Sequence, residues 1–357
     1  MFCVQTEGRG HMTQALALRE LLEEAGHQVV CVMASKSRRR KLPAYFRKAF
    51  GVPVRELASP NFVADKNNKK IRVFASIGYN LLLLPTFIVS LVKMRKLIHN
   101  AQPDYVINFH DFLTGIYHAL VPRQHHFIAT HRSYLAFHPE FPFAPGRTME
   151  RHLLKLCCEI MAAKAETRWA LSYRPYLPNH FGNTAVVPPL LQDIKPKNHQ
   201  DDGFYLAYMV NDGYAEDLIT SFDKCPPGTV AHCFWDRRGQ NDIWEARPGL
   251  YFHPLSRKKF LDHLRRCRGV ISTAGFETVC EAHLAGKPIG LIPTEGQYEQ
   301  ACNAVDAEAG GIAKRLGGYD LAEFVSYVEN GKFRPGIQTE WMAGRETWRK
   351  IISETVA

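Results

Sequence analysis

The sequence predicts an α/β protein with two tandem domains, each built on a largely parallel sheet. The chain has 357 residues, which is enough for two domains of ordinary size. Short apolar runs alternate with longer amphipathic segments, as in the strand–helix–strand units of parallel sheets. This alternation restarts near residue 204 after a polar linker. We therefore expect domains at residues 1–190 and 191–336, with a final helix at 338–354 inside a terminal segment, 337–357.

The first predicted unit is a strand at residues 2–5, a helix at 13–25 and a strand at 29–33. Its strand-to-helix turn contains Gly8, Gly10 and His11. The glycines let the backbone approach a ligand, and the helix start offers unpaired N–H groups. A tight turn without a ligand explains them equally well. An unperturbed histidine pKa of about 6.5 suits His11 to proton transfer, although a bond to the backbone is the alternative role.

Two more apolar runs in the first domain, at residues 105–109 and 127–130, have the length of strands. Polar side chains follow each of them at once: His110 and Asp111 after the first, and His131 after the second. Ligands bind at the carboxyl ends of the strands in open α/β sheets, so these residues are candidates for a site. For each of these histidines, a structural role explains its position as well as a role in a site does.

The second domain contains the most informative stretch, a predicted strand–helix–strand unit from Gly269 to Pro293. Backbone N–H groups at the start of its helix suit a diphosphate, and a carboxylate further along suits ribose hydroxyls. Carboxylate and amide groups after the next strand suit a sugar. Any one of these residues alone is explained by solvation or helix capping, but the set at two neighbouring strand ends favours a site. The candidates are Gly275, Thr278, Glu281, Glu299, Gln300 and Asn303.

The motifs around Gly8-x-Gly10-His11 and from Gly275 to Asn303 resemble those of the GT-B glycosyltransferases. The second motif keeps the spacing found in plant and animal UDP-glycosyltransferases and in the peptidoglycan N-acetylglucosaminyltransferase. The resemblance implies two Rossmann-like domains facing each other across a cleft, with the final helix crossing back to the first domain. It also implies transfer of a sugar from a UDP-sugar to an acceptor.

The resemblance assigns roles to individual residues of the second domain. It implies that Glu281 binds ribose, that Gly275 and Thr278 border the diphosphate, and that Glu299 and Gln300 meet the sugar. It also implies that backbone around Phe252 and His253 holds the uracil. This chain departs from the family in two places. Thr273 replaces a histidine of the plant enzymes, so backbone N–H groups and a hydroxyl must contact the phosphate. The phosphate loop is atypical, which weakens the candidates Asn211 and Gly213.

An inverting transfer needs a base for the acceptor hydroxyl and positive or dipolar groups on the departing diphosphate. His11 is the first choice for the base, Asp111 the second, and His110 and His131 follow. No metal or cofactor is expected, because helix N-termini and basic residues supply charge and the sequence has no Asp-x-Asp. The UDP-sugar itself is a substrate.

The net charge of +10 is unevenly distributed. Seven basic residues and no acid lie between Lys36 and Lys48, and a second basic segment lies between Arg257 and Arg268. The apolar run between Leu81 and Val92 contains a proline and is short for a membrane span, but basic residues follow it. These features predict docking at an anionic membrane surface and a lipid-linked acceptor. The alternative is a buried helix with a solvated basic loop.

Composition narrows the remaining possibilities. Nine cysteines without a Cys-x-x-Cys pair indicate a reducing compartment, and no signal peptide is recognised. We therefore expect a cytoplasmic protein, peripheral on the inner face of the membrane. Nucleic-acid binding is not expected, because the basic segments lack interleaved stacking aromatic residues in a recognisable RNA-binding module. Two alternatives to a transferase are a UDP-sugar epimerase of the same fold, which needs additional acids and histidines around the sugar, and a non-catalytic nucleotide binder.

Overall fold

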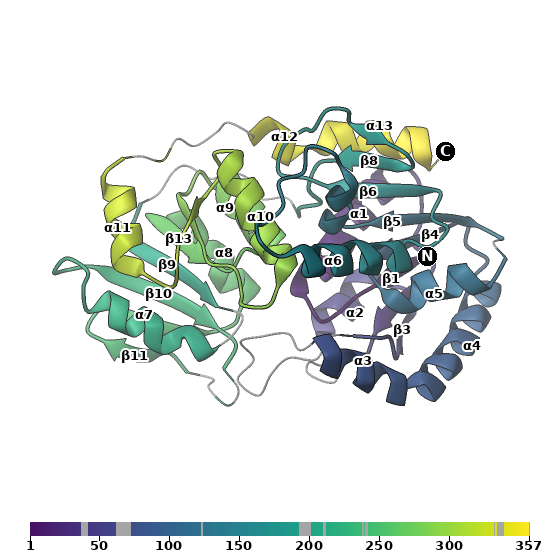
Figure 1. The fold of residues 1–357 in the computed structure, drawn as a ribbon, viewed down its shortest axis with the longest axis horizontal. Helices are drawn as coiled ribbons and strands as arrows, with labels where there is room; N and C mark the ends of the chain where they lie inside the picture. Colours follow the sequence, from purple (N-terminus) through teal and green to yellow (C-terminus); the bar gives the residue numbers. More distant parts are fainter. Residues whose placement is uncertain are drawn as a thin grey trace.

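The computed structural model describes residues 1–36, 42–61, 73–122, 124–192, 201–209, 212–237, 239, 242–331, 333 and 339–356. It contains two sheets, each covered by helices, which form the two lobes seen in Figure 1. The predicted fold class is confirmed. The predicted domain boundary near residue 190 falls in the segment between the last strand of the first sheet and the first strand of the second.

The first sheet has the strand order β3-β2-β1-β4-β5-β6-β8-β7. Its first six strands follow the Rossmann order, with the reversal of direction between β1 and β4. Alternate residues of the central strands enter two different hydrophobic cores: Phe2 and Ile107 one, Cys3 and Val106 the other. This sheet is therefore buried on both faces. The strands are β1 (Phe2–Val4), β2 (Val32–Ser35), β3 (Val54–Leu57), β4 (Tyr105–Phe109), β5 (His126–Thr130), β6 (Thr167–Leu171), β7 (His180–Phe181) and β8 (Thr184–Val187).

The helices of the first domain differ from expectation in two places. The first helix starts at Arg9 and not at residue 13, because Gly8 serves as its N-cap, a position that glycine tolerates. The kinked helix near Pro85 is two helices joined at Leu83, with Pro85 in the first turn of the second. The helices are α1 (Arg9–Glu24), α2 (Ala44–Phe50), α3 (Val73–Leu82), α4 (Leu84–Ala101), α5 (Phe112–Leu120), η1 (Arg132–Phe137) and α6 (Thr148–Met161).

The second sheet repeats the same topology, with the order β11-β12-β10-β9-β13-β14-β15 and an antiparallel edge strand, β11. Its reversal lies between β9 and β13. The strands are β9 (Phe204–Met209), β10 (Val230–Trp235), β11 (Trp244–Arg247), β12 (Leu250–Pro254), β13 (Gly269–Ser272), β14 (Ile289–Leu291) and β15 (Lys314–Arg315). The helices are η2 (Asp212–Tyr214), α7 (Ala215–Phe222), α8 (Arg257–Arg266), α9 (Phe276–Leu284), α10 (Tyr298–Ala309) and α11 (Leu321–Glu329).

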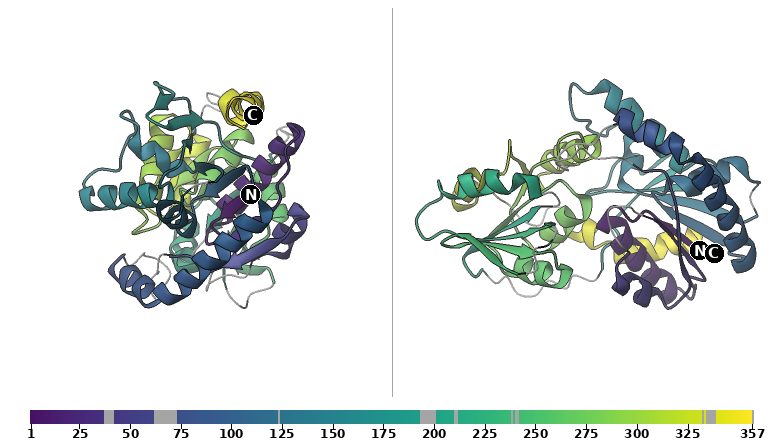
Figure 2. Two further views of the ribbon diagram at one scale, coloured as in Figure 1. Left: turned by 90° about the vertical axis from the view of Figure 1, so that its right-hand side faces the viewer. Right: turned by 90° about the horizontal axis from the view of Figure 1, so that it is seen from below.

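The chain ends on the first domain, as the fold class requires (Figures 1 and 2). The ring of Trp348 lies 5.2 Å from that of Trp169, and its Nε1 donates to the carbonyl of Pro188 at 3.2 Å. The predicted single helix is two, α12 (Thr339–Ala343) and α13 (Arg345–Thr355). Gly344 separates them with a φ of 44°, in the left-handed region that interrupts a right-handed helix.

Among the described helices, none alone is both long and apolar enough to cross a bilayer, and one bent pair, formed by α3 and α4, passes on length and composition only.

Candidate active site

The two domains meet where the strands of both sheets end. A Cβ built on Gly10, in the first turn of α1, would lie 3.3 Å from Oε2 of Glu277, in the first turn of α9. A second contact joins Nε2 of His131, after β5, to Oε1 of Glu299 on α10 at 3.9 Å. The predicted halves of the site thus face each other, and a side chain at Gly10 would press on the carboxylate of Glu277.

Three histidines gather on the side of the first domain. His11 comes from α1, while His110 and His131 follow the adjacent strands β4 and β5. The rings of His110 and His131 stack at 3.5 Å between centroids, and the ring of His11 lies 4.9 Å from that of His131. The order β1-β4-β5 explains this grouping, since neighbouring parallel strands deliver their last residues to one edge.

These histidines are uncharged at neutral pH. Burial lowers the pKa of His11 to about 4 and lowers the pKa values of His110 and His131 well below 6.5. Nδ1 of His131 accepts a hydrogen bond from the backbone N–H of Ser133 at 3.1 Å, so its proton resides on Nε2, which faces Glu299. Among the described residues, Nδ1 of His11 and Nδ1 of His110 are buried without a hydrogen-bond partner. Unpaired neutral imidazoles of this kind suit proton acceptance.

Asp111, the second choice for the base, has a structural position. Its side chain is fully buried. It caps α5 by accepting from the N–H and Oγ1 of Thr114, at 2.9 and 2.8 Å, and accepts from Oγ of Ser35 at 2.6 Å. These bonds tie α5 to β2, and the geometry gives no support to Asp111 as a base.

On the side of the second domain, α9 presents an N-terminus without a side-chain cap. Gly275 is the N-cap residue, and it and Thr278 are half-buried, whereas Thr273 is buried. The orphan N–H groups of such a helix start attract anions. The predicted diphosphate residues therefore lie where an anion can be bound by backbone.

Glu281 is buried on α9 and pairs with Arg257, whose Nη2 lies 2.8 Å from its Oε1. Burial raises the pKa of the Glu281 carboxyl, and Arg257 opposes that rise. Arg257 is the first residue of α8, so the ion pair connects the helices that follow β12 and β13. The sequence indicated Arg257 only as part of a basic segment and not as the partner of Glu281.

Glu277 is a site residue that the sequence reasoning missed. It lies one turn before Glu281 on the same face of α9, and its Oε1 is buried without a partner among the described residues. Burial, with a smaller contribution from Glu281, raises the pKa of Glu277 well above its usual range. The spacing of four between the two glutamates was the available signal.

The three polar candidates on α10 have different roles. Glu299 is partly exposed and faces His131, and burial raises its pKa. The Oε1 of Gln300 accepts from the N–H of Thr294 at 2.9 Å and so fixes the loop before α10. Asn303 is buried, and its Nδ2 donates to the carbonyl of Ala274 at 3.1 Å. Gln300 and Asn303 thus shape the site, while Glu299 is the one that contacts the opposite domain's histidine.

The side chain of Phe252, at the position predicted for the uracil, is not brought to the site. The ring of Phe252 is fully buried against Trp235 and Trp244, because Phe252 lies inside β12 and not after it. The backbone that follows this strand begins after Pro254. Asn211 lies outside the described residues, and Gly213 lies in η2.

A buried ionic cluster across the domain boundary was not predicted. Asp306 on α10 accepts hydrogen bonds from Arg132, Arg174 and Tyr176 of the first domain. The guanidinium of Arg132 also lies 4.3 Å from the ring centroid of Tyr173. Arg132 lowers the pKa of Asp306 below its usual range, against the opposing effect of burial. The cluster fixes α10, and with it Glu299, against the first domain.

The described residues contain two groups whose side-chain geometry suits a metal ion: His110 with His131 and Glu299, and His232 with His253 and His263. In each group the ligand atoms all lie within 4.8 Å of one another.

Two Rossmann-like domains with this site at their junction define the class of GT-B glycosyltransferases. The chain belongs to glycosyl transferase family 1, whose family model matches residues 1–329. None of the curated proteins matches the sequence.

Solved structures show the same fold over nearly the whole chain. A structure of LpCGTa in complex with UDP is 13% identical, with a TM-score of 0.63, and the match covers 100% of this chain and 99% of that one. The calicheamicin glycosyltransferase CalG4 is 14% identical, with a TM-score of 0.61 and coverage of 99% and 96%. The spinosyn rhamnosyltransferase SpnG with thymidine diphosphate is 13% identical, with a TM-score of 0.54 and coverage of 99% and 96%.

Proposed function

We propose that this glycosyltransferase moves a sugar from a UDP-sugar to an acceptor hydroxyl, with inversion and without a metal in the chemical step. The observation that carries the proposal is the approach of α1 to α9, where a Cβ on Gly10 would lie 3.3 Å from Glu277. Because His11 is next to Gly10, this approach supports His11 as the group opposite the helix start proposed for the diphosphate. A base and a leaving group on opposite sides of one sugar are what inversion requires.

His11 acts as the base in this proposal. Its burial keeps the imidazole neutral at pH 7, so a lone pair is available without prior loss of a proton. His131, stacked on His110, positions the acceptor side of the sugar together with Glu299. The imidazole of His11 takes the proton of the acceptor hydroxyl as the oxygen attacks the anomeric carbon, and UDP leaves.

The donor is held from the second domain. The uncapped N-terminus of α9 and the guanidinium of Arg257 supply the positive charge that stabilises the departing diphosphate, so no metal is needed for this. The carboxylate of Glu281 accepts ribose hydroxyls beside Arg257. UDP is preferred as the nucleotide because the motif resembles that of UDP-glycosyltransferases, and a UDP complex is known for LpCGTa.

A panel of UDP-, TDP- and GDP-sugars tests this proposal. We expect one UDP-sugar to release UDP, slowly when the sugar is transferred to water and faster when an acceptor is present. Adding Mg²⁺ or Mn²⁺ should not change the rate. Recovery of a changed sugar still attached to UDP would identify an epimerase instead. Turnover of TDP-sugars alone would retain the transferase and reject UDP as the donor nucleotide.

The outer face of α3 and α4 supports docking on an anionic membrane, where a lipid-linked acceptor would be met. The inner face of α4 is buried, and the helices lie on the outside of the first domain (Figure 2). Basic side chains at Lys93, Arg95 and Lys96 are exposed beside this apolar surface. The exposed apolar residues are Ile77, Leu81, Leu82, Leu84, Ile88, Val89 and Val92.

The basic segment between Lys36 and Lys48 was predicted to contribute to this surface, but its residues 37–41 lie outside the described residues. The nine cysteines are free, which supports a reducing compartment and hence the inner face of the membrane.

Flotation with vesicles of phosphatidylcholine and phosphatidylglycerol tests the docking surface. Leu82 has 82% of its surface exposed, and removing one inserted leucine costs about 1.5 kcal/mol or more, which is about tenfold in partitioning. The partitioning of Leu82→Glu onto the vesicles should therefore be about tenfold weaker than that of the wild type. The matched control is Leu177→Glu, because Leu177 is 81% exposed elsewhere. Equal flotation of the two variants, or a wild-type protein that remains at the bottom, would reject membrane docking.

A further inference from the structure

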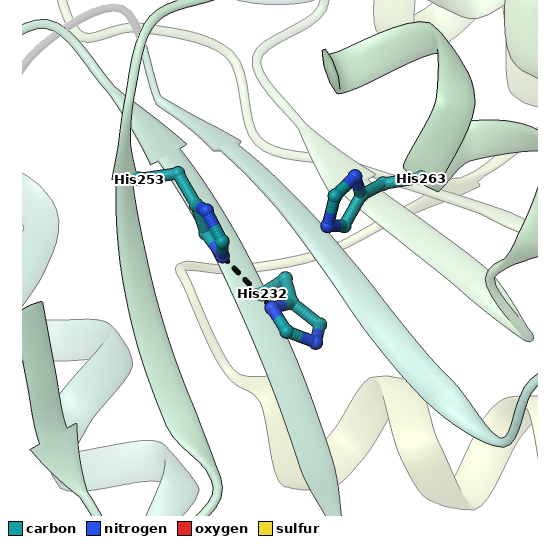
Figure 3. Close-up of side chains that lie close together, drawn as sticks. All are labelled: His232, His253 and His263. Carbon is teal, nitrogen blue, oxygen red and sulfur yellow. Dashed lines mark hydrogen bonds between the residues drawn. The ribbon is translucent and has the colours of Figure 1, made fainter. Parts of the chain in front are cut away.

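A second histidine cluster lies in the second domain, on the face of the sheet that α8 covers, and it includes His253, whose backbone was predicted to lie near the uracil. His232 lies on β10, His253 on β12 and His263 on α8 (Figure 3). In the parallel pairing of β10 and β12, His253 is opposite Phe234, two residues beyond His232. Side chains two residues apart share a face of a sheet, so both imidazoles point to the same side. His263 reaches them from α8, which covers that face.

The ligand atoms of the three imidazoles are already close. Nδ1 of His232 and Nε2 of His253 are 2.8 Å apart, and one nitrogen of each of the three rings lies within 4.8 Å of the others. Nδ1 of His263 is 2.8 Å from the carbonyl of Lys259. A carbonyl only accepts, so the Nδ1 of neutral His263 carries the proton and its Nε2 has a free lone pair.

The surroundings keep the imidazoles of His232 and His253 uncharged and in place. Burial lowers the pKa values of His232 and His253 to about 4, helped first by the neighbouring histidines of the cluster and then by Arg266 and Lys259 respectively. Aromatic rings pack on them: Phe234 stacks on His253 at 4.8 Å, and Tyr251 on His232 at 5.2 Å. Arg266 is itself paired with Asp202 and Asp262.

We propose that His232, His253 and His263 bind a zinc ion, with water in the fourth position. Three imidazoles and a water form a familiar tetrahedral set for Zn²⁺, with Zn–N distances of about 2.0–2.1 Å. Such distances place neighbouring ligand nitrogens about 3.4 Å apart. The contact between His232 and His253 must then open by about half an ångström, and the ring that donates moves its proton to its other nitrogen. This exchange between tautomers releases no proton.

A zinc ion at this site would connect α8 to the sheet, because its ligands come from α8, β10 and β12. Arg257 starts α8 and holds Glu281, so the ion secures the helix that carries one of the groups proposed at the donor site. The zinc itself takes no part in the chemical step. This inference does not rest on the proposed function, because it concerns only the three histidines and α8.

Zinc binding to tag-free protein is the test, measured by competition with a chromophoric chelator and by the visible spectrum of the Co²⁺ form. We expect one Zn²⁺ per chain, a tetrahedral Co²⁺ spectrum, and a loss of affinity of at least about tenfold in His263→Gln. His152→Gln is the matched control, because Nδ1 of His152 makes the same contact to a carbonyl four residues earlier, on α6. This control should bind zinc as the wild type does.

Three outcomes would overturn the inference. The first is that wild-type protein, shown by circular dichroism to be folded, takes up no zinc. The second is that His263→Gln binds zinc as tightly as the wild type. The third is that zinc binding is lost in His131→Gln and retained in His263→Gln, which would place the ion at the active-site group of His110, His131 and Glu299.

Discussion

Replacing Asp306 by alanine should destabilise the protein more than any exposed ion pair can. Asp306 is fully buried at the domain boundary and accepts hydrogen bonds from Arg132, Arg174 and Tyr176. Arg132 has only 1% of its surface exposed, so the substitution leaves a guanidinium buried without its counter-ion. Breaking a buried pair in this way costs about 3–5 kcal/mol.

The expected shift in melting temperature follows from the size of the chain. An unfolding entropy of about 2.1 cal/mol/K per residue gives about 750 cal/mol/K for 357 residues. A loss of 3–5 kcal/mol then lowers Tm by about 4–7 °C. The pKa of Asp306 is lowered in the folded state, so its stabilisation is present above the unfolded pKa of about 3.9 and is lost as pH falls further. Calorimetry at pH 7 therefore measures the full effect.

Glu24→Ala is the control for this measurement. Glu24 pairs with Arg345 and Arg349 at the surface, where ion pairs contribute about 0–1 kcal/mol. The Tm of Glu24→Ala should differ from that of the wild type by about 1 °C or less. If Asp306→Ala melts within 1 °C of the wild type, as the control does, the ionic cluster does not hold the domains together and the reasoning is wrong.

Two further predictions concern His11. His11→Ala should lower kcat by about 10²–10⁴-fold while the Kd for UDP is unchanged, as measured by steady-state release of UDP and by calorimetry; unchanged turnover would assign the base elsewhere. Because burial lowers the pKa of His11 to about 4, the base stays deprotonated, and kcat/KM should be level from pH 8 to about 5 and fall near pH 4. A fall centred near pH 6.5 would contradict a buried, neutral imidazole.

The fold was predictable because its signals are local. Apolar runs and helix stops repeat along the chain, and the unit from Gly269 to Pro293 carries its strand, helix start and glutamate within a short stretch. The sequence predicts the start of α1 too late, because two glycines indicate a turn before the helix. Gly8 is in fact the N-cap, and Gly10 lies inside the helix, where its missing side chain admits Glu277.

The roles within the site were less predictable, because they depend on contacts between distant segments. Asp111 accepts from Ser35, which is 76 residues away, and this contact gives the carboxylate a structural role that no motif reveals. Likewise, Asn303 bonds to a carbonyl 29 residues earlier. Arg132 and Asp306, 174 residues apart, form a pair that neither sequence neighbourhood signals.

The proposed zinc site could not be predicted, for the same reason. The sequence offered no Asp-x-Asp and no Cys-x-x-Cys pair, and therefore predicted no metal. His232, His253 and His263 lie on three separate elements, and only the pairing of β10 with β12 under α8 brings them together.

The central claim is that the second domain binds UDP through α9 and Glu281, and calorimetric titration of UDP tests it most directly. The wild-type protein should bind UDP with a Kd that is weakened at least about tenfold in Glu281→Ala, the loss expected for about 1.4 kcal/mol of hydrogen bonding to ribose. Glu308→Ala, which removes an exposed glutamate paired with Arg315 on the same domain, should bind like the wild type. The account is contradicted if folded wild-type protein binds no UDP, or if Glu281→Ala and Glu308→Ala bind it equally well.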